Sequence, residues 1–211
     1  SLQEFPFKPR QTPNKSEPAR FLTIGRFHRD KGQAYALLAL RRLLNTGREA
    51  SWTFVGAGPD KERLLSLSRR LGVHNNVMFF VDLKLEEIRD LYQKSHLFIL
   101  PSLNHTSPAE HVETQGVVLQ EAQASGCIPI ASKVGGIPEC IHHKVDGLLV
   151  KDRSSRAIAD AILYMLDHPE IWHSYQLAGR RNVEENFSAD VIGKRMASIL
   201  NDVIASHSPG N

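Results

Sequence analysis

The sequence has few residues that could crosslink the chain or anchor it in a membrane. Only two of its 211 residues are cysteines, Cys127 and Cys140, and they form no C-x-x-C pair. We therefore expect no disulfide framework and no structural zinc site, but two small buried thiols in a reducing compartment. No apolar run approaches the roughly 18 residues that a membrane-spanning helix needs, and no basic segment followed by a hydrophobic stretch opens the chain. The residues thus support neither a membrane span nor secretion.

A strong charge of either sign is also missing. The chain holds 26 basic and 23 acidic side chains, for a net charge of +3, and 41% of its residues are apolar. These values are typical of an ordinary soluble globular protein. The length fits one large α/β unit, or such a unit with an appendage, and is too short for two full domains of that kind.

The small positive excess is local. Residues 1–31 contain seven basic and three acidic side chains. Such a cluster suits a phosphate ligand better than a nucleic acid, because nucleic-acid-binding proteins usually spread a basic stripe over a whole face. We expect the charges from Lys8 to Lys15, and that of Arg20, to be solvated linker charges. The basic residues are Lys8, Arg10, Lys15, Arg20, Arg26, Arg29 and Lys31, and the acidic ones are Glu4, Glu17 and Asp30.

An extended linker is predicted at the N-terminal end. Residues 1–18 contain four prolines and no apolar periodicity, so we expect the natural protein to begin upstream of this segment. Six near-continuous apolar runs follow. Strands that are apolar on both faces are typical of a parallel sheet covered by helices on each side. The runs are 20–25, 51–56, 77–81, 97–100, 128–131 and 147–150.

Amphipathic helical patterns lie between these runs and after the last of them. Six β-α repeats predict an α/β fold with a doubly wound, parallel, Rossmann-like sheet over residues 19–187. Residues 188–211 are predicted to be a C-terminal helix and tail. The predicted helices are 33–45, 59–71, 85–94, 116–125, 154–167, 169–184 and 188–205.

In an open parallel sheet, ligands bind beyond the carboxyl ends of the strands, where the strand order reverses. With the common order 3-2-1-4-5-6, the loop after Gly25 faces the loop after Leu100. The first loop places Arg26 and Lys31 between a strand end and a helix start. Fixed cations and free backbone N–H groups at such a point suit a diphosphate, although ordinary exposed loop charges are an open alternative.

The second loop is long and leads into the helix predicted near Gly116. The backbone N–H groups of Gln115, Gly116 and Val117 would form an anion site at the start of this helix. Glu121 could accept hydrogen bonds from two ribose hydroxyls, and Glu113 from those of a sugar. The alternative is that Glu113 only stabilises the helix dipole and that Glu121 lies on a solvated face.

Two further patterns carry less weight. The histidines at positions 105, 111, 142 and 143 form no i, i+4 pair, so we do not expect a metal site. Gly56 and Gly58 lack the third glycine of a dinucleotide-binding fingerprint, because position 61 is a lysine. A tight turn between a strand and a helix is the favoured interpretation. We expect Trp52 and Trp172 to be packing residues.

The spacing of the two glutamates carries a resemblance to a known family. Glu113 and Glu121 are eight positions apart, with Gly116 at the third position after Glu113. The pattern resembles the E-x-x-G-x-x-x-x-E signature of the family 4 retaining glycosyltransferases (glycosyl transferases group 1). Their GT-B fold consists of two Rossmann-like domains, and the resemblance covers roughly residues 20–187. Other matching segments are Gly25-Arg26 to Lys31-Gly32, Gly56-Ala57-Gly58-Pro59, Pro101-Ser102, Gly135-Gly136-Ile137-Pro138-Glu139 and Asp146-Gly147.

The resemblance implies a role for each phosphate-facing residue. Arg26 and Lys31 would hold the diphosphate of a nucleotide-sugar donor, and the amides from Gln115 to Val117 would face the phosphates or the sugar. Members of the resembled family generally work without a catalytic metal, which two cations and a helix N-terminus can replace, so the resemblance implies no metal and no other cofactor. The family also implies transfer with retention of configuration.

The rest of the donor is assigned in the same way. The resemblance implies that Glu113 contacts the donor sugar, as a catalytic residue together with the two cations, and that Glu121 binds the ribose. Backbone near Val81 to Leu83 would border the base, and Gly25 at the end of the first strand would let the chain turn closely at the diphosphate. One departure is that the glycine usual after the third strand is replaced by Val81 or Asp82.

A second departure is the ten residues, 103–112, between Pro101-Ser102 and Glu113. A family branch that acts on exopolysaccharides or lipid-linked glycans is similar in this loop. We therefore expect the donor-binding half of a glycosyltransferase, inactive alone, whose N-terminal half supplies the acceptor site and receives the crossover helix at 188–205. The expected enzyme is cytoplasmic, with peripheral membrane association open for the full-length protein. An epimerase, a phosphorylase, a non-catalytic nucleotide-sugar-binding module and a docking partner for another transferase subunit are alternatives.

Overall fold

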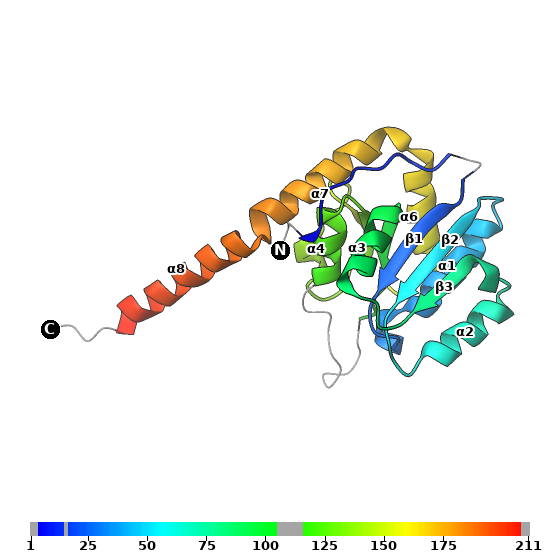
Figure 1. Cartoon of the computed structure of the whole chain (residues 1–211), viewed down its shortest axis with the longest axis horizontal. Helices are drawn as coiled ribbons and strands as arrows, with labels where there is room; N and C mark the ends of the chain where they lie inside the picture. The colour runs from blue at the N-terminus through cyan, green and yellow to red at the C-terminus, as the bar shows by residue number, and fades with distance from the viewer. Residues whose placement is uncertain (1–3, 15–16, 105–115, 208–211) are drawn as a thin grey trace.

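The computed structural model describes residues 4–14, 17–104 and 116–207. Its centre is a six-stranded parallel sheet in the order β3-β2-β1-β4-β5-β6 (Figure 1). This confirms the predicted doubly wound sheet and its strand order. The strands are β1 Ala19–Ile24, β2 Ala50–Val55, β3 Val77–Phe80, β4 Leu97–Leu100, β5 Ile128–Ser132 and β6 Leu148–Val150.

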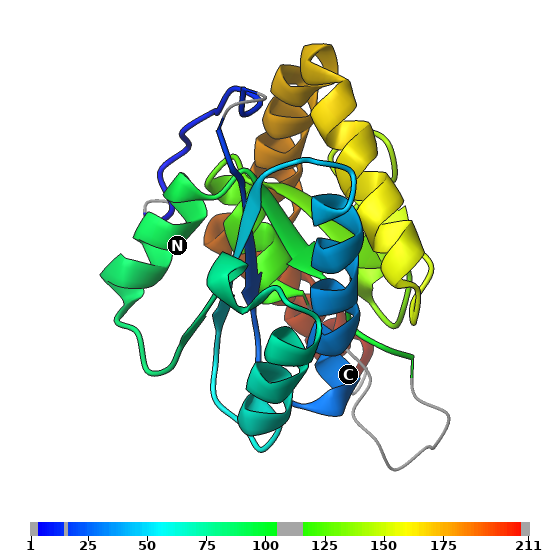
Figure 2. The ribbon, with the colours of Figure 1, turned by 90° about the vertical axis from the view of Figure 1, so that its right-hand side faces the viewer.

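Helices cover both faces of the sheet (Figure 2). Helices α1, α2 and α6 pack over one core cluster and α3 and α4 over the other, while α7 contributes Trp172 and Tyr175 to the first and Val183 to the second. The helices are α1 Gln33–Leu44, α2 Lys61–Arg70, α3 Leu85–Lys94, α4 Val117–Ala124, α5 Ile137–Cys140, α6 Ser155–Asp167, α7 Trp172–Asn186 and α8 Ala189–His207. The short helix α5 is the one that was not predicted.

The strands are buried on both faces because their side chains alternate between the two clusters. In β1, Phe21 belongs to the cluster under α1 and α6, whereas Leu22 belongs to the cluster under α3 and α4. Strand β4 alternates in the same way and is buried along its whole length. A strand with no polar face can lie only between two helical layers, which is why the apolar runs predicted the architecture.

The packing residues are placed as expected. Trp52 and Trp172 are buried, with exposed fractions of 0% and 2%. Cys127 and Cys140 are free and buried. Burial raises the pKa of the Cys127 thiol to about 11, so this thiol stays protonated at neutral pH.

The N-terminal segment is attached more firmly than a linker of solvated charges would be. Residues 4–14 run along α3, α4 and α7 (Figure 1), and Phe5 is buried in the second core cluster. Arg10 donates hydrogen bonds to the carbonyls of Tyr92 and Gln93 at the end of α3, and to that of Ser125 at the end of α4. The prediction of a solvated Arg10 is wrong, because its guanidinium binds the unpaired C-terminal carbonyls of two helices.

We therefore expect Arg10→Met to lower the free energy of unfolding by about 2 kcal/mol, the size of a lost charge-assisted hydrogen-bond group. Urea denaturation followed by circular dichroism measures this change. Lys8→Met is the matched control, because it removes an exposed cation from the same segment and should cost much less. Equal losses in the two variants would contradict the assigned contacts.

Helix α8 leaves the body of the domain and extends away from it (Figure 1). A row of apolar side chains on it is 46–64% exposed. Among the residues that the structure describes, no helix is long and apolar enough to cross a membrane. The exposed row consists of Ile192, Met196, Ile199, Leu200 and Val203.

Candidate functional site

The strand order reverses between β1 and β4, which is where a ligand of an open parallel sheet is expected, and the loops after these two strands lie next to each other there. The two loops touch. The backbone N–H of Leu103 donates to the carbonyl of Asp30 at 2.7 Å. Gly32 has a φ of +64°, and a Cβ atom at this position would lie 1.9 Å from the carbonyl oxygen of Pro101. Glycine is thus required where the first loop meets the second.

Arg26 lies in the first loop, just after β1. Its side chain is 62% exposed, and its guanidinium lies 3.6 Å from Oδ2 of the buried Asp30. Gln33 donates from Nε2 to the carbonyl of Arg26 at 2.7 Å, and Nδ1 of His28 lies 2.7 Å from Oδ1 of Asp30. The structure therefore holds the backbone of Arg26 in place and leaves its charge facing solvent.

Asp30 and Gln33 were not identified from the sequence as parts of this site. Both are buried polar residues, and their contacts with Arg26 and His28 hold the loop after β1 in place. Lys31 lies beside them in a three-residue 3-10 helix, Arg29–Lys31, and is partly exposed. Both predicted phosphate ligands, Arg26 and Lys31, thus lie in one loop at the carboxyl end of β1.

The Gly56-Ala57-Gly58 turn supports the same loop. A Cβ atom at position 56 would lie 2.1 Å from the carbonyl oxygen of Gly25, and one at position 58 would lie 2.4 Å from that of Phe27. Phe27 also donates its N–H to the carbonyl of Ala57 at 2.8 Å. These contacts confirm the interpretation as a tight turn between a strand and a helix.

Helix α4 begins at Val117, within a residue of the predicted start. Glu113 and Gln115, two of the predicted ligands, lie outside the described residues. The amide of Gly116 and the side chain of Gln120 hydrogen-bond the sulfur of Cys140, whose pKa is nevertheless raised by burial. Cys140 therefore lies beside the start of α4. Nothing in the sequence identified it as a neighbour of the site.

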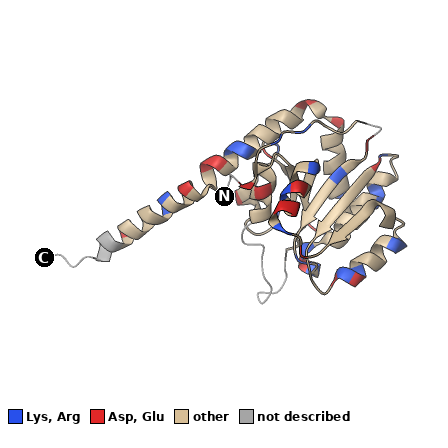
Figure 3. Cartoon of the chain, viewed as in Figure 1, with Lys and Arg blue, Asp and Glu red and all other residues tan. Residues whose placement is uncertain are grey.

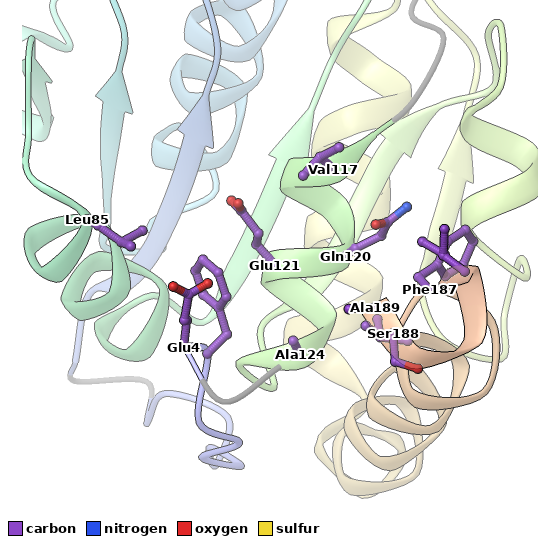
Figure 4. Close-up of a pocket in the computed structure, with 12 residues that line it drawn as sticks. Glu4, Leu85, Val117, Gln120, Glu121, Ala124, Phe187, Ser188 and Ala189 are labelled. Carbon is purple, nitrogen blue, oxygen red and sulfur yellow. The ribbon is translucent and has the colours of Figure 1, made fainter. Parts of the chain in front are cut away.

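Glu121 extends from α4 into a pocket of about 330 Å³. Figure 4 shows Glu121 and Gln120 leaving the helix in different directions, Glu121 towards the side of Leu85 and Gln120 towards that of Phe187. Burial raises the pKa of Glu121, while a hydrogen bond of 2.9 Å from the Tyr92 hydroxyl opposes this shift. The pocket is lined by Glu4, Phe5, Leu85, Val117, Gln120, Glu121, Ala124, Val183, Phe187, Ser188, Ala189 and Ile192.

The segment after β3 lies near this pocket through Leu85, the first residue of α3. Val81 and Leu83 are both half-buried and pack against opposite core clusters. Between them, Asp82 has a φ of +55°, a conformation that glycine adopts at little cost. Of the two residues that could replace the family's glycine, Asp82 is the one with a glycine-like backbone.

Asp82→Gly should therefore raise the free energy of unfolding by about 0.5 kcal/mol. Relief of the positive φ contributes about 1 kcal/mol, and the larger entropy of the unfolded chain offsets part of it. Lys84→Gly in the same loop is the control, since Lys84 is extended and its replacement should only destabilise. Thermal unfolding of both variants tests the difference, and a loss of stability in both would contradict the expectation.

Two of the four conspicuous histidines have local structural partners. His142 lies 2.7 Å from the buried Asp146, and His143 accepts a hydrogen bond from the N–H of Leu149 at 3.0 Å. His105 and His111 lie outside the described residues. Within the ranges that the structure describes, no three His, Cys, Asp or Glu side chains are grouped as metal ligands.

One protein family matches the chain over a range that includes β1 to β6 and the loops described above. The family described as "Glycosyl transferases group 1" matches residues 4–182, which is most of the chain. The chain belongs to this family. The matched range starts inside the N-terminal segment, so the family pattern includes part of the predicted linker.

Curated relatives support the assignment. The amylovoran biosynthesis glycosyltransferase AmsK of Erwinia amylovora is 31% identical over 185 residues, which are 87% of this chain and 45% of AmsK. The GDP-mannose-dependent alpha-(1-6)-phosphatidylinositol monomannoside mannosyltransferase of Mycobacterium tuberculosis is 30% identical over 81% of this chain and 44% of its own. The chain thus spans about half the length of the curated relatives that it matches.

Solved structures show the same fold at lower identity. Sucrose-phosphate synthase from Thermosynechococcus elongatus has a TM-score of 0.80 at 24% identity, covering 97% of this chain and 51% of its own. Anabaena Alr3699/HepE in complex with UDP-glucose has a TM-score of 0.77 at 22% identity, over 89% and 50%. The C-terminal domain of the group 1 protein LpcC from Francisella tularensis has a TM-score of 0.72 at 22% identity, over 89% and 98%. The fold of the chain is that of one half of a GT-B glycosyltransferase.

Proposed function

We propose that this chain is the donor-binding half of a retaining glycosyltransferase. The enzyme would transfer a sugar from a nucleoside-diphosphate sugar to a hydroxyl group of a glycan or lipid-linked acceptor. The observation that carries the proposal is the meeting of the Arg26–Lys31 loop with the loop after β4 at the point where the strand order reverses. Support comes from HepE, solved with UDP-glucose, and from AmsK and the mannosyltransferase, whose names state transferase activities.

The cations act on the leaving group in this proposal. When the bond between sugar and phosphate breaks, negative charge accumulates on the nucleoside diphosphate. Arg26, whose side chain is exposed, and Lys31 stabilise that charge, with the amides of Gln115 and Val117 beside them, whereas the Gly116 amide hydrogen-bonds the sulfur of Cys140. Because charge increases in the transition state, these contacts lower the barrier and do not merely bind substrate.

The remaining assignments follow the family signature. Glu121 accepts hydrogen bonds from the ribose hydroxyls in the pocket beside α4, and Glu113 binds the donor sugar. Backbone from Val81 to Leu83 borders the base, and Gly25 lets the chain turn closely at the diphosphate. Retention of configuration, catalysis without a metal and the class of acceptor are all parts of the proposal that derive from the family resemblance.

The acceptor site would belong to a second, N-terminal domain. The relatives are about twice as long as this chain, which supports a missing half. Helix α8 supports it too, because its exposed apolar row needs a partner surface. Figure 3 shows charges of both signs on this helix, with uncharged residues between them. We propose that α8 packs against that half. The chain alone would bind the donor and transfer nothing, and a cytoplasmic location at or near a membrane surface remains a prediction for the whole enzyme.

Calorimetric titration of the chain with UDP, GDP and ADP tests the proposed function. Saturable binding of at least one of them, unchanged by EDTA, is the expected result. A chain that binds none of the three would refute donor binding, and binding that is lost in EDTA would refute metal independence. Product analysis of the full-length protein with a panel of nucleotide sugars then tests transfer and its stereochemistry.

A further inference from the structure

Tyr92 is a fully buried residue of α3 whose hydroxyl reaches the carboxylate of Glu121. The hydroxyl oxygen lies 2.9 Å from Oε2 of Glu121 and 3.1 Å from the carbonyl oxygen of Val118. A tyrosine hydroxyl has one proton and can donate it to one acceptor at a time. The ionised carboxylate is the stronger acceptor, so the proton is shared mainly with Glu121.

The Tyr92 ring is held rigidly on several sides. Its centroid lies 5.8 Å from that of Phe5 in an edge-to-face arrangement and 5.6 Å from that of Phe98. The backbone carbonyl of Tyr92 accepts a hydrogen bond from Arg10. The hydroxyl is therefore a fixed point, and the side chain of Glu121 is the more adaptable of the two partners.

This contact uses only one oxygen of the Glu121 carboxylate. Oε2 accepts from the Tyr92 hydroxyl, and within the described ranges no hydrogen bond reaches Oε1, on a side chain that lines the pocket. A carboxylate can accept from two vicinal hydroxyls only if its plane is held towards them. We infer that Tyr92 is a positioning residue for the donor ribose, which orients the carboxylate of Glu121 to accept both ribose hydroxyls. The inference rests on the proposed function, in which Glu121 binds the ribose.

The charged groups near Glu121 determine how its pKa changes when the Tyr92 hydroxyl is removed. Glu4 from the N-terminal segment faces the same pocket and raises the pKa of Glu121, in addition to burial. Arg89 of α3 lies 3.5 Å from Glu4, and Arg180 of α7 donates to the carbonyls of Phe5 and Ala124. The Tyr92 hydroxyl lowers the pKa of Glu121, so its removal should let the carboxylate protonate at a higher pH.

The test compares a nucleoside diphosphate with its 2′,3′-dideoxy counterpart. The base is whichever of uracil, guanine or adenine the unmodified chain binds best. The unmodified chain should prefer the ribose form at least about tenfold, because two hydrogen bonds to a charged group are lost with the dideoxy form. Tyr92→Phe should weaken binding of the ribose form about fivefold and leave binding of the dideoxy form unchanged. When the pH is lowered, Tyr92→Phe should also begin to lose affinity for the ribose form at a higher pH than the unmodified chain does.

Two control variants separate positioning from a structural effect. Tyr175→Phe removes the hydroxyl of another buried tyrosine, which belongs to the opposite core cluster, and should change neither affinity. In a Glu121→Ala background, Tyr92→Phe should have no further effect on the ribose form, since the positioned group is gone. If Tyr92→Phe does not fold, Phe5→Leu, which loosens the ring but keeps the hydroxyl, should reduce the preference for ribose in the same direction.

The outcomes distinguish the two proposals. Equal weakening of both ligands by Tyr92→Phe, or no change in the ribose preference, would overturn the positioning role and leave donor binding intact. The same holds if Tyr92→Phe still acts in the Glu121→Ala background. If the unmodified chain binds no nucleoside diphosphate, the proposed function itself fails, and the positioning role fails with it.

Discussion

Replacing Arg26 and Lys31 together by alanine should weaken the binding of a nucleoside diphosphate by about 100-fold or more. Each cation can form a charge-assisted hydrogen bond with a phosphate oxygen, and losing such a bond costs about 1.5–3 kcal/mol. The sum of two losses corresponds to two or more factors of ten in the dissociation constant. Titration calorimetry of the double variant against the unmodified chain measures this ratio.

Arg29→Ala is the matched control for that variant. Arg29 belongs to the same loop, is exposed and carries the same charge, but no phosphate contact is assigned to it. It should weaken binding only a few-fold, through the general field of the loop, and that loss should shrink as salt is added. If Arg29→Ala weakened nucleoside diphosphate binding as much as the double variant, the loop would attract phosphate only through its total charge. Arg26 and Lys31 would then have no specific contacts with it.

The fold could be predicted because its signal lies in local sequence. Strands such as Leu97–Leu100 are apolar on both faces, and only a sheet between two helical layers buries them. Helix α5 was missed because it has four residues, of which only Ile137 and Cys140 are buried, too few to show a period. The packing of residues 4–14 was missed for another reason. Its contacts are made by a few side chains, such as Phe5 and Arg10, with partners more than 80 positions away.

The site could be predicted only in part. Arg26, Lys31 and Glu121 follow from strand ends and from the family signature, and the strand order reverses between β1 and β4 as expected. The residues behind them could not be found in this way. In the sequence, Asp30 is one of several charged residues in its loop. Tyr92 fits the apolar stripe of its helix, so the sequence does not indicate the hydrogen bond between Tyr92 and Glu121. Supporting contacts depend on tertiary geometry, which a motif does not encode.

The second large effect is expected at Gly32, where the loops after β1 and β4 meet. Gly32→Ala should lower the free energy of unfolding by about 3 kcal/mol. An alanine at a φ of +64° costs about 1 kcal/mol, and its Cβ would lie 1.9 Å from the carbonyl oxygen of Pro101. That neighbour is backbone and cannot rotate away, so one of the loops must shift, at a further cost of about 2 kcal/mol. Urea unfolding measures the change.

Gly47→Ala separates the two parts of this effect. Gly47 has a φ of +80°, but a Cβ atom there would meet nothing within 4 Å, so the variant carries the conformational cost without the clash. It should lose only about 1 kcal/mol. The shift of the loop in Gly32→Ala should also weaken nucleoside diphosphate binding, because Arg26 and Lys31 belong to the displaced segment, whereas Gly47→Ala should bind normally. Equal stability losses in the two variants, or an unchanged affinity in Gly32→Ala, would show that contact with Pro101 does not hold the loop of Arg26 and Lys31 in place.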